Sequence, residues 1–176
     1  MMKQRQGLGT IRELELSAGT SVLPGSFALA ALLTALLRRA GRTPAQAALA
    51  AAAALPLHWS CDLWHQLGHA AAARAAGFPM RGIHFWGVLS TSLYPADEPP
   101  LPAEVHIHRA LGGPAASLLG AFVAGVLWRQ ARRPGSGSDL VLFALADHLL
   151  LGLGALLPLP FTDGGTLLTW WPRRQP

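Results

Sequence analysis

The chain has 176 residues, of which 51% are hydrophobic and 13% are Asp, Glu, Lys or Arg, and its mean hydropathy is +0.33. Because soluble domains carry roughly 25% charged residues, this composition favours contact with lipid. The net charge of +5 comes mainly from arginines at the ends of apolar segments, which suits anionic lipid head groups and excludes a nucleic-acid surface of interleaved basic and aromatic residues. The single cysteine excludes an intrachain disulfide. A water-soluble helical bundle is the alternative.

Four apolar segments approach the length of a membrane span, which takes about 20 apolar residues with a range of about 17 to 25. We therefore predict an integral, multi-pass membrane protein of mainly α class, with one membrane-embedded domain over residues 1–176. Residues 1–20 contain no apolar run before a small-residue cleavage site, so we expect no removable signal peptide. The expected spans are 21–37, 45–76, 110–128 and 140–159.

Two stretches outside the spans have strand character. The alternation over residues 13–16 predicts a short strand before the first span. Residues 81–95 are rich in β-branched and aromatic side chains and precede the proline-dense DEPPLP, which predicts a strand or hairpin between the second and third spans. That element would lie at the membrane face or in a protein-lined cavity. Within the second span, Pro56 is expected to break the helix.

The second span carries two histidines four residues apart, His65 and His69. On a helix, residues at this spacing lie on one face, so both rings could point at one ion. Neutral imidazole suits zinc, and two histidines with one distant ligand leave a coordination position open for water. The chain has seven histidines, so the spacing alone is weak evidence for a metal site.

A carboxylate near the end of the last span strengthens the case for a metal. Asp163 follows an apolar run, where an ionised group is costly unless it is paired or bound to metal. The adjacent Gly164 and Gly165 would let the backbone turn and bring the carboxylate inward. Alternatively, Asp163 could cap a short terminal helix.

Together with further motifs, these residues resemble the site-2 protease family, intramembrane zinc metalloproteases that cut substrate segments within the bilayer. From roughly residue 25 onward the family's features follow in order: a first span, a histidine-motif helix continuing as HAAAARAAGFPMRGIHF, the Gly-Gly-Pro of HRALGGPAASLL, and LLPLPFTDGG. Residues 65–69 match the H-E-x-x-H motif, and Asp163 matches the aspartate of L-D-G, although threonine precedes it. The resemblance implies a Zn²⁺ site formed by His65, His69 and Asp163, and a membrane-spanning protein or peptide as substrate or partner.

Three positions depart from the family pattern. Gln66 stands where the family has the glutamate that takes a proton from the attacking water, and a neutral amide cannot accept that proton. Losing such general acid-base help costs about 10² to 10⁴ in rate. Ser117 and Ala155 stand where members of the family usually carry asparagines that help hold the substrate. The resemblance thus implies a protease scaffold with impaired cleavage.

Other polar residues lie within the expected spans. Asp62 and His58 precede His65 on the same helical face, and either could hold an imidazole in place or face a polar interface. Asp147 and His148 could form a buried polar pair, a proton path or an inter-helix hydrogen bond.

Three functional hypotheses follow from the sequence. The first is an intramembrane metallopeptidase relative with slow cleavage, whose hairpin edge would take an extended substrate. The second is a non-catalytic pseudoprotease that binds or regulates a membrane partner. The third is a helical bundle without metal, in which the histidines are structural.

Overall fold

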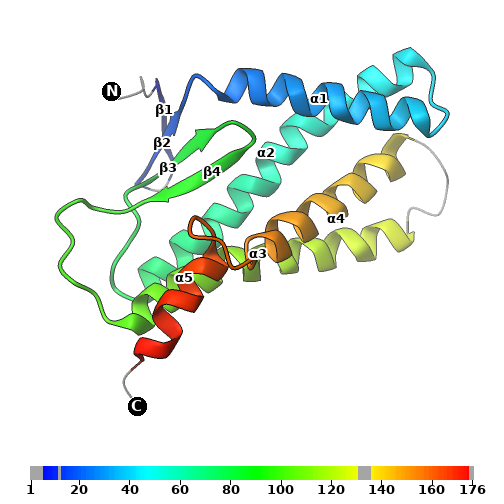
Figure 1. The fold of residues 1–176 in the computed structure, drawn as a ribbon. Helices are drawn as coiled ribbons and strands as arrows, with labels where there is room; N and C mark the ends of the chain where they lie inside the picture. The colour runs from blue at the N-terminus through cyan, green and yellow to red at the C-terminus, as the bar shows by residue number, and fades with distance from the viewer. Residues whose placement is uncertain (1–5, 12, 131–135, 175–176) are drawn as a thin grey trace.

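A computed structural model describes residues 6–11, 13–130 and 136–174, and in this part of the chain helices predominate over a small sheet at one end of the molecule (Figure 1). The helices are α1 (Val22–Arg39), α2 (Pro44–Ala75), α3 (Ala103–Gln130), α4 (Ser136–Gly154) and α5 (Asp163–Trp170), which a short 3₁₀ turn (Trp171–Arg173) follows. The strands are β1 (Gln6–Ile11), β2 (Leu14–Ala18), β3 (Gly82–Trp86) and β4 (Leu89–Leu93).

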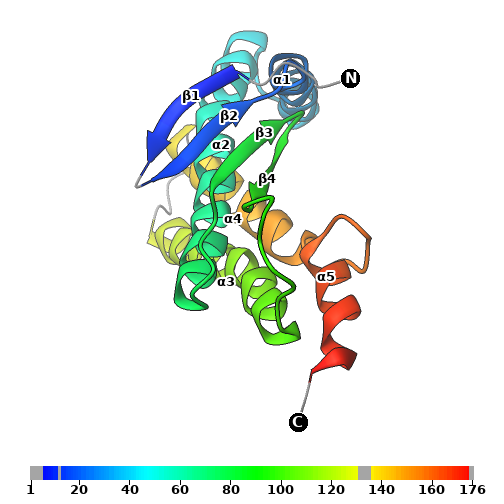
Figure 2. The same ribbon diagram turned by 90° about the vertical axis from the view of Figure 1, so that its left-hand side faces the viewer.

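The sheet has the order β1-β2-β3-β4, so β4 is an edge strand on the side toward α5 (Figure 2). The predicted strand near residues 13–16 is β2, and β3 and β4 form an antiparallel pair within residues 81–95. The sequence did not predict β1, or the parallel pairing of β2 with β3. Parallel strands need a long connection, and here α1 and α2 supply it.

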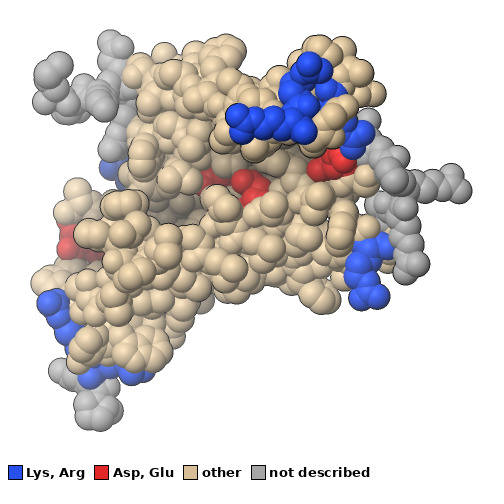
Figure 3. Space-filling view, turned by 45° about the vertical axis from the view of Figure 1, so that its right-hand side comes forward, with Lys and Arg blue, Asp and Glu red and all other residues tan. Residues whose placement is uncertain are grey.

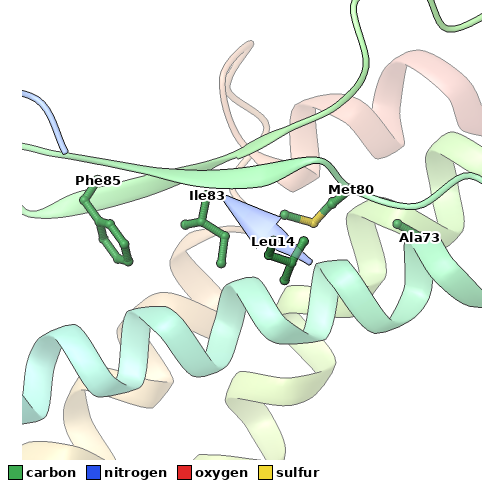
Figure 4. Close-up of a cluster of buried hydrophobic side chains, with 5 residues drawn as sticks. All are labelled: Leu14, Ala73, Met80, Ile83 and Phe85. Carbon is green, nitrogen blue, oxygen red and sulfur yellow. The ribbon is translucent and has the colours of Figure 1, made fainter. Parts of the chain in front are cut away.

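A hydrophobic core holds the sheet against α2. Its buried members are Leu14 from β2, Ala73 from α2, Met80, and Ile83 and Phe85 from β3 (Figure 4). Ile83 is fully buried, because β3 is an inner strand whose one face lies on the helix. This packing fixes the sheet beside the helix that carries the two histidines.

Helix α2 has 32 residues and begins at a complete capping box. The Thr43 hydroxyl accepts from the Gln46 amide at 3.3 Å, and the Gln46 side chain accepts from the Thr43 amide at 3.1 Å. The expected break at Pro56 does not occur, since the helix runs through it. Pro56 itself is exposed, but α2 packs along its length against α1, α3 and α4, and a helix held in this way tolerates the one backbone hydrogen bond that proline removes. The Ser60 hydroxyl donates to the Pro56 carbonyl at 2.7 Å.

Helices α2 and α3 cross at two glycines. A Cβ atom added to Gly68 would overlap the carbonyl of Gly112, and one added to Gly112 would overlap that of Gly68. Only glycine permits this approach, in which the two backbones touch. The crossing brings residue 113 of α3 against the face of α2 that carries His65 and His69.

The burial pattern is the reverse of that in a soluble bundle. The side chains of His58, Asp62, His65, Gln66 and Arg109 are all buried, while large apolar side chains of α1, α3 and α4 are exposed. On the face that Figure 3 shows, Lys and Arg lie toward the edges, and acidic side chains lie both along a hollow across the middle and at one edge. Within the described residues, three helices are long and apolar enough to cross a membrane: Val22–Arg39, Ala103–Gln130 and Gly137–Gly154.

The helix bounds differ from the expected spans at two places. Helix α3 begins at Ala103 rather than at residue 110. Its first two turns carry polar residues, and the expected span was defined by apolar residues alone. Helix α4 ends at Gly154 rather than at residue 159, since Pro158 and Pro160 cannot continue it. The segment between α4 and α5 is a compact turn that leads directly to Asp163.

Candidate metal centre

His65, His69 and Asp163 converge on one point, and they are the only group of three or more potential metal ligands found in the described part of the chain. The two Nε2 atoms lie 3.0 Å apart. Asp163 Oδ2 lies 3.5 Å from Nε2 of His65 and 3.4 Å from Nε2 of His69. Both imidazoles are buried, and the carboxylate is 18% exposed. The site therefore joins the middle of α2 to the first residue of α5.

The turn before α5 explains why the carboxylate points inward. The Thr162 hydroxyl accepts from the Gly165 amide at 3.3 Å and so caps α5, which leaves the Asp163 carboxylate free of the capping role considered as an alternative. The Gly164 amide donates to the Ala155 carbonyl at 2.8 Å. A Cβ added at Gly164 or Gly165 would overlap backbone carbonyls of the turn, so both positions require glycine because of close approach.

Hydrogen bonds at the two Nδ1 atoms orient the histidine rings. His69 Nδ1 lies 2.6 Å from the Arg109 carbonyl, which can only accept, so this nitrogen carries the proton and Nε2 presents a lone pair to the site. The Gly113 amide is a longer contact of the same nitrogen, at 3.3 Å. His65 Nδ1 lies 2.9 Å from the Ser117 hydroxyl, which can accept its proton in the same way.

The three donors fit a small divalent cation. Nitrogen and carboxylate ligands lie about 2.0 to 2.2 Å from tetrahedral zinc, which places neighbouring donors about 3.3 Å apart, close to the distances between these three atoms. Two Nε2 lone pairs that face each other beside a carboxylate repel unless a proton or a metal cation lies between them. Burial alone would raise the pKa of Asp163, but its interactions with His65 and His69 outweigh burial and hold that pKa below its usual value.

A glycine of α3 leaves the room that an ion needs. A Cβ added to Gly113 would overlap Nε2 of both His65 and His69. We therefore expect Gly113→Ala to weaken zinc binding by about 100-fold, the upper range for changes beside metal ligands. Competition with a chromogenic chelator measures this affinity.

Gly125→Ala is the matched control, since a Cβ at that position of α3 meets only Leu145 at 3.8 Å. Unchanged affinity in Gly113→Ala would mean that the two rings do not converge beside α3.

Gln66 lies one residue beyond His65 and faces the sheet rather than α3. Its side chain is buried, and its Oε1 accepts from the Ser92 hydroxyl of β4 at 2.8 Å. This contact ties the edge strand to α2 beside the metal ligands. Ser92 carried no sequence signal for a role at the site.

The other predicted site residues occupy different places. Ser117 is fully buried and contacts His65, so in this structure its side chain has no surface for a substrate. Ala155 contributes its carbonyl to the turn before Asp163. Asp62 makes no hydrogen bond to either imidazole among the described residues, and other partners occupy both Nδ1 atoms. The orienting role considered for Asp62 falls to Ser117 and to the Arg109 carbonyl.

Arg109 is a site residue that the sequence did not reveal. Its guanidinium is buried, pairs with Glu98 at 2.5 and 2.9 Å, and donates to the Phe78 carbonyl at 2.6 Å. It also lies over the Tyr94 ring, 3.9 Å from the centroid. The side chain thus holds the loop after β4, while the carbonyl of the same residue orients His69.

No protein-family model matches the sequence, and no curated protein matches it. Among solved structures, the chain is similar to the Site-2 Protease from Methanocaldococcus jannaschii, with a TM-score of 0.65, 18% identity, and coverage of 94% of this chain and 70% of that one. At 18% identity this similarity shows the fold but does not assign a role to any residue, so the roles rest on the geometry described above. The chain therefore has a site-2-protease-like fold, with a candidate metal site at His65, His69 and Asp163.

Proposed function

We propose that this chain is a multi-pass membrane protein that binds Zn²⁺ through His65, His69 and Asp163 and takes an extended segment of a membrane protein beside that site, with slow peptide cleavage. One observation carries the proposal: two Nε2 lone pairs and a carboxylate oxygen from distant parts of the chain meet within hydrogen-bond range of one another in a buried position. The site-2-protease-like fold agrees with it.

The membrane part of the proposal rests on the reversed burial pattern. Three helices are apolar enough to span a bilayer, and α2 would be a fourth, central span whose polar side chains face protein rather than lipid. The large exposed apolar side chains of the outer helices would then contact lipid tails. Retention in the membrane pellet after alkaline carbonate washing is the expected result.

Zinc, when bound, would lower the pKa of a coordinated water to about 7 and polarise a peptide carbonyl. Among the protein groups beside it, the Asp163 carboxylate balances the positive charge, and the Ser117 and Arg109 contacts keep both Nε2 atoms turned inward. Gln66 can donate or accept a hydrogen bond but cannot take a proton. Without that proton transfer, cleavage is slower by about 10² to 10⁴.

Strand β4 supports the placement of the bound segment. One edge of β4 pairs with β3, and the structure pairs its other edge with no described strand. An extended peptide added there would lie along α2 beside the ligands, because the Gln66–Ser92 contact holds β4 against that helix.

Metal analysis of the purified full chain tests the central claim. We expect about one zinc per chain after gentle purification in detergent, and its loss on treatment with a strong chelator. A content below about 0.1 zinc per chain, with no uptake on titration with zinc, would leave the third hypothesis, a bundle whose histidines are structural.

A pseudoprotease that binds a membrane partner without cutting it is the second candidate. The observation in its favour is that the Gln66 amide oxygen is already engaged by Ser92, so the side chain serves to hold β4. Both candidates require the metal site and the strand, and they differ in whether the wild-type chain shows any zinc-dependent cleavage of membrane-spanning peptides.

A further inference from the structure

The face of α2 that meets β4 carries a regular series of polar side chains. His58, Asp62 and Gln66 follow at four-residue spacing on the helix, and all three are buried. Opposite them lies the alternating inner face of β4 and the turn before it. Four helical residues rise about 6 Å and two strand residues about 6.6 Å, so the two repeats stay in step.

Each helix residue has a counterpart in the hairpin. His58 Nε2 lies 2.8 Å from the Val88 carbonyl, and Gln66 accepts from Ser92 at 2.8 Å. Between them, Ser90 lies beside the Asp62 carboxyl, and the Oδ2 of Asp62 and the Oγ of Ser90 are buried without a hydrogen-bond partner among the described residues. The two end contacts are therefore the ones with regular hydrogen-bond geometry.

His58 also contacts α4. Its Nδ1 lies 3.0 and 3.1 Å from the two carboxylate oxygens of Asp147. The Val88 carbonyl can only accept, so Nε2 carries a proton. With Asp147 ionised, Nδ1 donates to its carboxylate as well, and the imidazole then carries two protons. The buried ion pair of a cationic His58 with Asp147 satisfies both contacts. Asp147 thus pairs across helices rather than with its neighbour His148.

Removing one proton from this pair leaves a single N–H on the ring. A charge-assisted bond to the carboxylate is roughly twice as strong as a neutral bond to a carbonyl, so the remaining proton stays on Nδ1, toward Asp147. Nε2 then presents a lone pair to the Val88 carbonyl, and the two repel. The hydrogen bond that holds the hairpin turn to α2 is then lost.

We propose that the doubly protonated His58, paired with Asp147, acts as a latch that holds the β3–β4 turn and the adjoining end of β4 against α2. Loss of its proton releases this end of the strand. The groups that face His58 agree with the cation. Asp147 comes from α4, Asp62 comes from α2 itself, and the hairpin contributes the Val88 carbonyl. The Cys61 thiol of α2 lies beside Asp147 and Asp62 rather than the ring. On the α1 side, the Gly87 amide keeps its own bond to Ser21, at 3.0 Å. The effect of the latch on a bound segment rests on the proposed function, but the latch itself does not.

The test uses the full-length wild-type chain in detergent micelles. Nitrogen-15 NMR of labelled histidine reports whether the His58 ring is cationic or neutral at each pH, and hydrogen-exchange mass spectrometry reports protection of residues 86–93. We expect a cationic ring at neutral pH. At the pH where the ring becomes neutral, the exchange rate of residues 86–93 should rise about tenfold or more. This rate is first corrected for base catalysis by comparison with an unstructured peptide of the same sequence.

Variants separate the latch from general loosening. His58→Gln can donate to only one of the two acceptors and should show the faster exchange at every pH. Asp147→Asn should give a neutral ring at pH 7 with slow exchange that no longer depends on the protonation of the ring, because an asparagine amide can donate to Nδ1 and leave the single ring proton on Nε2 for the Val88 carbonyl. His108→Gln, an exposed histidine in α3, should behave as wild type. The measurements are repeated with zinc and with chelator, so that the outcome for His58 does not depend on whether the chain binds zinc.

A neutral His58 ring throughout, or titration of the ring without any change in hairpin exchange, would overturn the proposal. If a variant does not fold, the wild-type titration alone decides.

Discussion

Replacing Asp163 with asparagine is expected to lower the zinc affinity by more than about 100-fold and to bring the zinc content of the purified chain below about 0.1 per molecule. Changes to residues that merely support a metal ligand cost about 10- to 100-fold in affinity, and Asp163 is one of only three candidate ligands found among the described residues. The variant keeps the size of the side chain but removes the negative charge that balances the ion. His65→Ala and His69→Ala should have the same effect.

The control for this prediction is Asp139→Asn. Asp139 also lies near a helix end, in the first turn of α4. Its carboxylate pairs with Arg42 at 2.5 Å, far from the metal site, and both side chains are partly exposed. Its zinc content should equal that of the wild type. Full zinc in Asp163→Asn together with loss in both histidine variants would show that another group completes the site. Full zinc in all three variants would refute the site altogether.

The parts of the site that the sequence predicted are those in which side-chain identity carries the signal. Two histidines at helical spacing and a carboxylate beside two glycines are visible as letters, and the structure brings all three together. The contact of His69 with the Arg109 carbonyl has no such signature, because every residue has a carbonyl. Which carbonyl faces a ring depends on how α2 and α3 cross.

The parts that the sequence missed depend on distant pairing. The expected inter-helix hydrogen bond of Asp147 is confirmed, but the sequence could not name its partner, which is His58 of α2. In the same way β1 and the parallel β2–β3 pair need contacts across two helices, and no local pattern encodes them. Pro56 illustrates the opposite error, in which a strong local signal is overridden by helix packing.

The second prediction concerns the missing proton acceptor. Gln66→Glu is expected to raise the rate of cleavage of membrane-spanning peptides by about 10² to 10⁴ without changing the zinc content. The substitution adds a carboxylate of the same shape next to the metal ligands. The existing contact is compatible with it, because a glutamate oxygen can accept from the Ser92 hydroxyl as Oε1 of Gln66 does. The edge of β4 should therefore stay in place.

Gln46→Glu is the matched control, since Gln46 lies on the same helix and glutamate serves equally well at that position of a capping box. Its cleavage rate should equal that of the wild type. Equal and rapid cleavage by the wild type and by Gln66→Glu would contradict the proposal that cleavage is impaired. Zinc-loaded Gln66→Glu without activity would favour the pseudoprotease and would place the remaining defect at Ser117 or Ala155.

Those two positions are not equally open to repair. Ser117 is fully buried, and even a Cβ at Gly152 would lie only 3.1 Å from its Cβ, so the larger Ser117→Asn side chain must displace α4 or His65. Ala155 is only partly buried, and its role in the turn uses the carbonyl, which Ala155→Asn retains. Activity should therefore be sought first in Gln66→Glu combined with Ala155→Asn. The same double variant with Asp163→Asn should be inactive, because any cleavage gained must pass through the metal site.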